Sequence, residues 1–193
     1  MHNKPQSVFF IGKPGSGKGT QAKLLAGKTD WPIIGSGALF REIAAENTPA
    51  GRKVKEEIDQ GLLAPHWFAM YLYMRSLFAL PANTSAIFDG FNRKEDEARL
   101  IVSSMHWLDR SFLVVHLHVS DEVIRARLEG RIKTAGRVDD HYVDTRLEEY
   151  ETYTTKALEI FSDMGCLVDI DGEQEPQKIG RDIEAALGIT TPA

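Results

Sequence analysis

The sequence has little cysteine. Its 193 residues contain a single thiol, at Cys166. One cysteine excludes an intramolecular disulfide, and it also excludes a zinc site built from several cysteines. We therefore expect no structural zinc, and we expect Cys166 to be a small buried apolar side chain.

Long apolar runs and an excess of positive charge are also missing. No run reaches the length of a transmembrane helix, and the first six residues lack the apolar core of a signal peptide. These absences predict a cytoplasmic protein. The formal net charge of −5 argues against nucleic acid or an anionic membrane as the main partner. Any anion must then be bound locally, by individually placed cationic side chains.

The chain does contain a regular alternation of short apolar runs and longer helical stretches. The apolar runs, which favour strands, are residues 8–11, 33–34, 86–88, 112–119 and 167–170. This order predicts an α/β fold with a parallel sheet and helices on both faces, because parallel strands need crossover connections. The length suits one globular domain with a small inserted lobe.

The strongest functional signal is the glycine-rich stretch at residues 12–20, Gly-Lys-Pro-Gly-Ser-Gly-Lys-Gly-Thr. It follows an apolar run and precedes a helical stretch, which is the context of a phosphate-binding P-loop. Glycines let backbone N–H groups curl around phosphate oxygens, and the helix N-terminus adds partial positive charge. Because Gly19 stands where Ser or Thr usually follows the lysine, Thr20 is the nearest hydroxyl for Mg²⁺.

Further charged residues fit the same chemistry. Asp89 ends an apolar run, where P-loop enzymes place the carboxylate that holds magnesium-bound water. Arg93 has the planar fork that suits bidentate phosphate contacts. Arg127 and Arg131 are four residues apart and share one helix face.

Together these segments resemble a known family. The P-loop with its Lys-Gly-Thr-Gln ending resembles the opening of adenylate kinases, within the nucleoside monophosphate kinases. Residues 34–41, 61–66 and 89–93 are similar to the family's Ser-Thr-Gly-Asp-x-x-Arg, Gly-x-Leu-Val-Pro-Asp and Asp-Gly-Phe-Pro-Arg. The similarity continues through Arg-x-x-x-Arg at 127–131, Gly-Arg-x-Asp-Asp at 136–140 and Arg-Leu at 146–147, so it covers nearly the whole chain.

The resemblance implies an architecture and an activity. The architecture is a three-layer α/β/α core with a five-stranded parallel sheet, formed by residues 1–34, 65–130 and 142–193. A helical acceptor-binding lobe would span residues 35–64, and a short lid would span residues 131–141. The implied activity is transfer of the terminal phosphoryl group of ATP to a nucleoside monophosphate, with AMP favoured (ATP + AMP ⇌ 2 ADP). The implied enzyme is a Mg²⁺-dependent monomer whose partners are small nucleotides.

The resemblance also assigns residues to the two nucleotides. The ATP side would comprise Gly15, Ser16, Gly17, Lys18, Gly19, Thr20, Arg127, Arg131 and Arg137. The AMP side would comprise Ser36, Gly37, Arg41, Leu62, Ala64, Gly90, Arg93 and Glu97. The catalytic cations would be Lys18, Arg93, Arg127, Arg137 and Arg146. Asp89 would hold Mg²⁺ through water, with Thr20 as a further candidate ligand.

The substitutions that depart from the family pattern lie on the acceptor side, at Ser36, Ala38, His66, Asn92 and Glu97. The spacing between Asp140 and Arg146 is also two residues shorter than in the family pattern. Asn92 replaces a proline, and we expect a local change of backbone there. Glu97 replaces the glutamine that reads the adenine edge, and an ionised carboxylate only accepts hydrogen bonds. Two interpretations follow: either Glu97 faces the base and suits two adjacent donors, as in guanine, or it is solvated on a charged helix.

Other functions remain open from the sequence. One is the same chemistry with GMP, CMP or UMP as acceptor, and another is a nucleotide-binding regulator or ATPase on the kinase scaffold. His116 and His118 lie on one face of a strand, but no third and fourth ligand accompanies them. We expect them to be packed or hydrogen-bonded core residues.

Overall fold

The computed structural model describes residues 4–62, 64–135 and 141–189. Within them, five parallel strands form one sheet in the order β2-β3-β1-β4-β5. The strands are β1 (Ser7–Ile11), β2 (Ile33–Gly35), β3 (Ala86–Asp89), β4 (Phe112–His118) and β5 (Leu167–Asp171). All five predicted apolar runs are strands, so the predicted α/β fold and its parallel sheet are confirmed.

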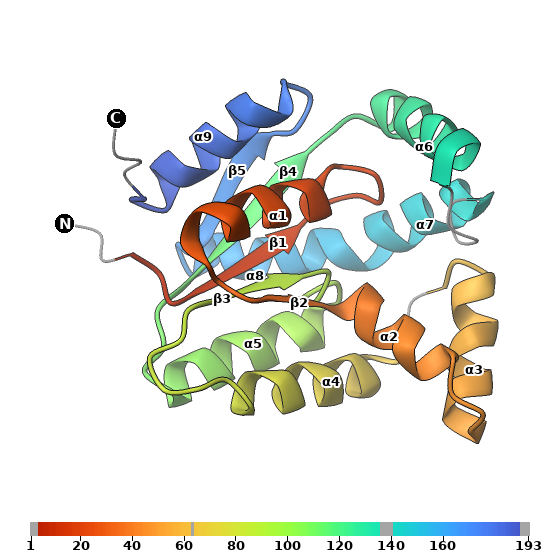
Figure 1. Cartoon of the computed structure of the whole chain (residues 1–193), viewed down its shortest axis with the longest axis horizontal. Coiled ribbons are helices and arrows are strands. Elements are labelled where there is room, and N and C mark those ends of the chain that lie inside the picture. The colour runs from red at the N-terminus through yellow and green to blue at the C-terminus, as the bar shows by residue number, and fades with distance from the viewer. Residues whose placement is uncertain (1–3, 63, 136–140, 190–193) are drawn as a thin grey trace.

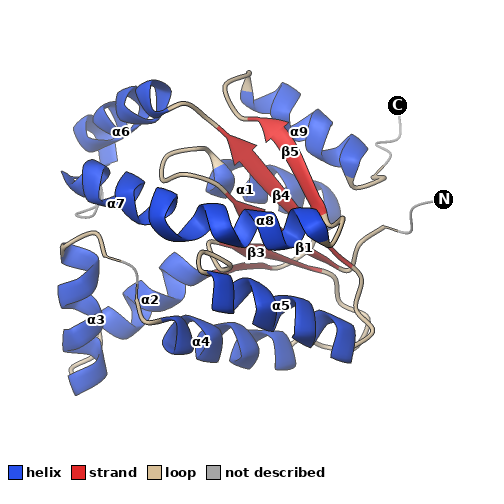
Figure 2. Ribbon diagram, turned by 180° about the vertical axis from the view of Figure 1, so that it is seen from behind, coloured by secondary structure: helices blue, strands red, loops and turns tan. Residues whose placement is uncertain are grey.

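Helices connect the strands and cover both faces of the sheet (Figures 1 and 2). They are α1 (Lys18–Thr29), α2 (Ser36–Ala44), α3 (Pro49–Asp59), α4 (His66–Phe78), α5 (Glu95–Trp107), α6 (Asp121–Ala135), α7 (Val143–Glu149), α8 (Thr155–Asp163) and α9 (Pro176–Ala186). A single π-helical turn, η2 (Tyr150–Thr154), joins α7 to α8. The three segments form one continuous helical run across the back of the sheet (Figure 2).

The alternation of side chains along β1 divides the core into two layers. Phe9 belongs to the cluster that packs against α4, α5 and α8, whereas Phe10 belongs to the cluster that packs against α1 and α9. Both rings are fully buried. Phe9 stacks on Phe88 of the neighbouring strand, with 4.7 Å between ring centroids. Strands covered on both faces are apolar throughout, which explains why the sequence shows them as continuous apolar runs.

The carboxyl ends of the strands point toward α2, α3, α6 and α7, which gather on one side of the molecule (Figure 1). α2 and α3 pack on each other and occupy most of the stretch 35–64. Thr48 caps α3 by accepting a 2.9 Å hydrogen bond from the Gly51 amide. The carboxyl edge of the parallel sheet therefore faces this group of helices (Figure 1).

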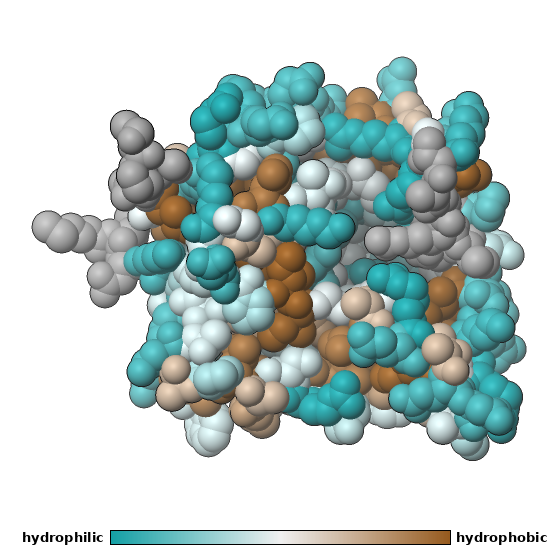
Figure 3. All heavy atoms as spheres, in the orientation of Figure 1, coloured by the Kyte–Doolittle hydropathy of each residue, from teal (hydrophilic) through white to brown (hydrophobic). Residues whose placement is uncertain are grey.

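The fold can be compared with two expectations from the sequence, one about Cys166 and one about transmembrane helices. The Cys166 side chain is buried, and desolvation raises the pKa of its thiol to about 11, so the expected apolar role is confirmed. No helix in the described ranges is long and apolar enough to cross a membrane. Hydrophilic side chains cover most of the face seen in Figure 3, with apolar side chains in groups between them.

Phe161 of α8 provides a test of the larger core cluster, because its ring is fully buried there. Phe161→Ala should lower the free energy of unfolding by about 3–5 kcal/mol through lost burial and a residual cavity. Urea denaturation of the purified variant measures this loss. Met164→Ala is the control on the same helical run, at a side chain that is 46% exposed. Equal stability of the two variants would contradict the packing described for α8.

Candidate active site

The loop between β1 and α1 has the backbone geometry of an anion-binding turn. Gly12, Gly15 and Gly17 all have positive φ angles, of 148°, 81° and 98°. A Cβ atom on Gly12 would lie 2.7 Å from the carbonyl oxygen of Leu117, so only glycine fits at this position. The loop leads directly into α1, whose free N–H groups point back toward it.

Lys18 folds back onto this loop. Its Nζ donates to the carbonyl oxygens of Gly12 and Lys13, both at 2.7 Å, and to Ser16 Oγ at 3.3 Å. Burial lowers the pKa of the Lys18 ammonium to about 7, although the nearby Asp89 carboxylate acts in the opposite direction. An anion bound in the loop would stabilise the charged ammonium, so the site is electrostatically suited to phosphate.

Asp89, at the end of β3, faces the start of α1. Its Oδ2 lies 3.5 Å from the position that a Cβ on Gly19 would take. Thr20 is exposed one residue further along. No group of three or more His, Cys, Asp or Glu in the described parts of the chain could hold a metal ion. One carboxylate and one hydroxyl nevertheless fit Mg²⁺, which prefers oxygen ligands and binds largely through water and substrate phosphates.

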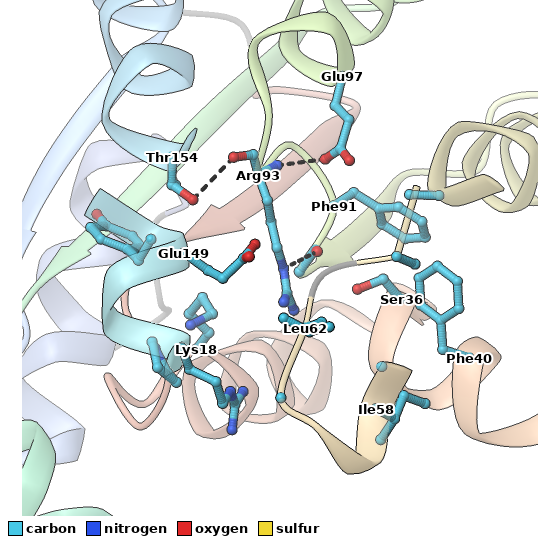
Figure 4. Close-up of a pocket in the computed structure, with 18 of the residues that line it drawn as sticks. Lys18, Ser36, Phe40, Ile58, Leu62, Phe91, Arg93, Glu97, Glu149 and Thr154 are labelled. Atoms are coloured by element: carbon cyan, nitrogen blue, oxygen red, sulfur yellow. Dashed lines mark hydrogen bonds between the residues drawn. The ribbon is translucent and has the colours of Figure 1, made fainter. Parts of the chain in front are cut away.

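A cavity opens beside the P-loop, between α2, α3, the loop after β3 and the α7–η2 helix (Figure 4). Its empty volume, including the open mouth, is about 1200 Å³. Ten of the residues assigned from the sequence line it: Lys18, Ser36, Gly37, Arg41, Leu62, Ala64, Gly90, Arg93, Glu97 and Arg146. Residues from five distant segments therefore meet in one place.

Several lining residues were not found from the sequence. The apolar ones include Phe40, Val54, Ile58 and Phe91, and the polar ones include Glu149, Tyr150 and Thr154. Phe40, Val54 and Ile58 belong to the apolar faces of α2 and α3, so their periodicity was a usable signal. Glu149 and Thr154 carry no such pattern, because only tertiary packing shows that their side of the helix faces the cavity.

Positive charge is concentrated in this cavity although the protein is acidic overall. Arg41, Arg93 and Arg146 line it together with Lys18. The charges of Arg93 and Arg146, and that of Arg131 on α6, are close enough to contribute to the lowered pKa of Lys18. The Glu149 carboxylate points toward the Arg93 side chain (Figure 4). Three carboxylates, of Glu57, Glu97 and Glu149, also line the cavity, so the four cations exceed them by one. Arginine and lysine side chains gathered in this way favour a ligand with several anionic oxygen atoms.

Arg127 and Arg131 lie outside the cavity lining. From α6, Arg127 donates to the carbonyl oxygen of Gly172 at 2.8 Å and to that of Ser16 at 3.4 Å, so it bridges the loop after β5 and the P-loop. Arg131 lies on the same helix, four residues on. Arg137 falls outside the described residues.

Glu97 is only 3% exposed, so the interpretation that it is solvated on a charged helix is wrong. Its Oε2 accepts hydrogen bonds from the backbone amides of Arg93, at 2.7 Å, and Lys94, at 3.3 Å, and so caps the first turn of α5. Burial raises the pKa of this carboxyl, while the bonds from Arg93 and Lys94 oppose the shift. The side chain lines the cavity and fixes the backbone beside it.

Asn92 shows the expected local change of backbone. Its φ is 64°, in the left-handed region, and no described peptide bond is cis. Asparagine tolerates this conformation better than most residues do. Its side chain is fully buried, and neither amide atom has a hydrogen-bond partner among the described residues.

The two histidines of β4 differ from one another. The Nδ1 of His116 lies 2.6 Å from Asp169 Oδ1, and its Nε2 lies 2.9 Å from the Tyr150 hydroxyl. His116 is buried, so the expected hydrogen-bonded core role is confirmed for it. The expectation is wrong for His118, which is exposed because its strand ends there.

Comparison with known proteins gives a consistent result. The family model described as adenylate kinase matches residues 10–166. The chain is 34% identical over 184 residues to adenylate kinase 1 of Nostoc sp., covering 94% of this chain and 98% of that protein. It is 30% identical over 209 residues to an adenylate kinase of Chlamydia felis, covering 94% of this chain and 98% of that protein. It is 34% identical over 185 residues to adenylate kinase 1 of Synechocystis sp., covering 93% of this chain and 95% of that protein.

The buried amide of Asn92 generates a stability prediction. Asn92→Gly should raise the free energy of unfolding by about 1 kcal/mol, because it removes a buried polar group without partners and a left-handed side chain. Asn83→Gly is the matched control, since Asn83 has a φ of 62° but is exposed. Thermal and urea unfolding measure both variants. A gain at Asn83 equal to that at Asn92 would show that the buried amide costs nothing.

Proposed function

The chain belongs to the adenylate kinase family, and from this premise we propose that the cavity beside the P-loop is where its two nucleotides meet. The protein transfers the terminal phosphoryl group of ATP to AMP, which gives two molecules of ADP. The observation that supports the placement is the convergence of Lys18 of the P-loop with Arg41, Arg93 and Arg146 in one cavity. Transfer between two phosphates needs such a site, because both reactants are anions.

The chemistry requires little covalent help from the protein. An oxygen of the AMP phosphate forms a bond to the terminal phosphorus of ATP, and the bond from that phosphorus to the bridging oxygen breaks, so that ADP leaves. No side chain has to act as a nucleophile. The protein contributes by aligning the two phosphates and by stabilising the charge spread over the transferring group.

The donor phosphates would occupy the loop of Gly15, Ser16, Gly17, Lys18, Gly19 and Thr20. Its backbone N–H groups and the Lys18 ammonium would bind their oxygens. Arg127 already contacts the Ser16 carbonyl from α6 and is placed beside this loop. We assign Arg131 and Arg137 to the same nucleotide.

The acceptor phosphate would be bound by Arg41 and Arg93, whose planar forks suit bidentate contacts. Gly90 permits close approach here: a Cβ on it would lie 2.7 Å from Ser36 Oγ and 2.9 Å from Arg93 Nη2. Arg146 enters from the opposite wall and is suited to the phosphoryl group in transit. The other acceptor residues would be Ser36, Gly37, Leu62, Ala64, Gly90 and Glu97.

We assign the metal site to Asp89, through water, with the Thr20 hydroxyl as a further ligand. When bound, Mg²⁺ would neutralise phosphate charge and orient the terminal group for displacement. The short distance between Asp89 and the start of α1 supports this assignment, as does the absence of bulk at Gly19.

Two segments would close over the nucleotides. We assign the acceptor lobe to residues 35–64, the lid to residues 131–141, and the core to residues 1–34, 65–130 and 142–193. Closure would exclude water, which otherwise competes for the phosphoryl group. One chain supplies both sides of the cavity, so we propose that the enzyme acts as a monomer.

Lys18 provides the direct test of the donor site. Lys18→Met should reduce the rate of ADP formation from ATP and AMP at least about a hundredfold, because a fixed cation on the phosphates is lost. Lys23→Met is the control, on the exposed side of the same helix. A coupled assay measures the rates, and circular dichroism checks the fold. A folded Lys18→Met enzyme with near-normal activity would refute the donor site, and transfer to no monophosphate by the unmodified protein would refute the proposed function.

Glu97 provides the test of acceptor choice. We expect AMP to be the main acceptor with weakened discrimination against GMP, because an ionised carboxylate cannot donate to adenine N1. Glu97→Gln should raise kcat/KM for AMP about tenfold, since the amide supplies a donor and its oxygen still accepts the backbone hydrogen bonds. Glu95→Gln, at an exposed residue of the same turn, is the control. Specificity constants for the four monophosphates decide the matter: a strict AMP preference that Glu97→Gln leaves unaltered would exclude a base-reading role.

A further inference from the structure

The hydroxyl of Thr154 in η2 makes an unusual contact. Three other hydroxyl side chains in helices bond to the carbonyl oxygen four residues earlier, in the pairs Thr29–Leu25, Ser76–Leu72 and Thr155–Glu151, all at 2.8 Å, and Ser104 bonds to that of Ile101, three residues earlier. Thr154 instead donates to the carbonyl oxygen of Arg93, 61 residues away, at 3.0 Å. Thr154 is 2% exposed, so water does not compete freely for this bond.

The Thr154 bond completes a set of restraints on Arg93. The Arg93 amide donates to Glu97 Oε2 at 2.7 Å, and its Nε donates to the Gly90 carbonyl oxygen at 2.7 Å. Figure 4 shows Thr154 and Glu97 on opposite sides of the Arg93 backbone, with the side chain extending into the cavity between them. Glu97 therefore holds the amides on both sides of Arg93, through the N–H groups of Arg93 and Lys94. Thr154 holds the Arg93 carbonyl from the side of η2.

The π-turn explains how Thr154 comes to face the cavity. Thr154 follows Arg146 by eight residues, which in a regular α-helix would turn it about 80° away from Arg146 around the helix axis. A π-turn has more residues per turn, so it rotates Thr154 back toward the side that carries Arg146. Both residues line the cavity. One helical run thus places Arg146 in the cavity and the Thr154 hydroxyl on the backbone of Arg93.

We propose that Thr154 is a positioning residue for phosphoryl transfer: its hydroxyl holds the Arg93 backbone so that the guanidinium lies in register with Arg146 at the acceptor phosphate. The inference rests on the proposed function, which assigns Arg93 to that phosphate. Thr154 itself touches no nucleotide in this role, and it acts through Arg93 alone.

Three variants test the contribution of the Thr154 hydroxyl. Thr154→Val keeps the shape of the side chain and removes the donor, which leaves the Arg93 carbonyl without this partner. Thr154→Ser restores the hydroxyl. Thr155→Val is the matched control, because it removes a hydroxyl bond that is internal to the helix. Initial rates are measured with AMP varied at saturating ATP, and with ATP varied at saturating AMP.

Thr154→Val should lower kcat/KM for AMP about tenfold and change KM for ATP less than twofold. Thr154→Ser should return kcat/KM for AMP to within about twofold of the unmodified enzyme, and Thr155→Val should match that enzyme. Equal losses toward ATP and AMP, or a Thr154→Ser enzyme as poor as Thr154→Val, would overturn the proposal, because a general defect of the fold would then explain the loss.

A double-mutant cycle with Arg93→Ala tests whether Thr154 affects AMP binding through Arg93. Calorimetric AMP binding should weaken about tenfold on Thr154→Val in the unmodified protein and should not weaken further in the Arg93→Ala background. Additive losses would show that Thr154 acts by another route. If Thr154→Val does not fold, the same cycle is carried out with Thr154→Ala. Transfer to no monophosphate by the unmodified enzyme refutes the proposed function, whereas an active enzyme indifferent to Thr154→Val refutes only the positioning role.

Discussion

The gathering of four cationic side chains around one cavity, balanced only in part by the carboxylates of Glu57, Glu97 and Glu149, is the constraint on which this structure depends. Lys18 and three arginines line a partly buried space, and burial already lowers the pKa of Lys18 to about 7. The chain offsets the repulsion by giving cations backbone acceptors: Lys18 bonds to the carbonyl of Gly12, and Arg93 bonds to that of Gly90. Such carbonyls fix the cations in place while leaving their charge for a ligand. A bound polyanion would add charge-assisted hydrogen bonds to cations that are already fixed in place.

The parallel sheet is what makes this crowding possible. β1 and β3 are neighbours in the same direction, so the P-loop after β1 and Asp89 at the end of β3 reach the same edge. The glycines of the P-loop then allow α1 to start close to that carboxylate. Helices α2 and α3 close the cavity from one side, and the α7–η2 run closes it from the other. The fold therefore brings Lys18, Arg41, Arg93 and Arg146 to one cavity from segments that are far apart in the sequence.

Sequence reasoning succeeded where a local pattern has one structural meaning. Apolar runs became strands, and the glycine-rich stretch became a loop with positive φ angles that leads into α1. It left two interpretations open at Glu97, and the solvated one is wrong, because the side chain folds back to cap its helix and is buried. Thr154 had no local signal at all, because its partner lies 61 residues away. Contacts between distant segments depend on packing angles, and no single stretch of sequence contains them.

The π-turn between α7 and α8 has a consequence for the evolution of the chain. Leu147 before the turn packs into a small cluster with residues of α6, whereas Phe161 after it packs into the main core below the sheet. The turn changes the angle at which later side chains leave the helix axis, so one long helical run packs into two separate hydrophobic clusters. A substitution at η2 alters one contact, but a one-residue insertion or deletion there would rotate every later side chain by about 100° relative to its layer. Homologous chains should therefore conserve the length of this turn more strictly than the identity of its exposed residues, such as Glu151 and Tyr153.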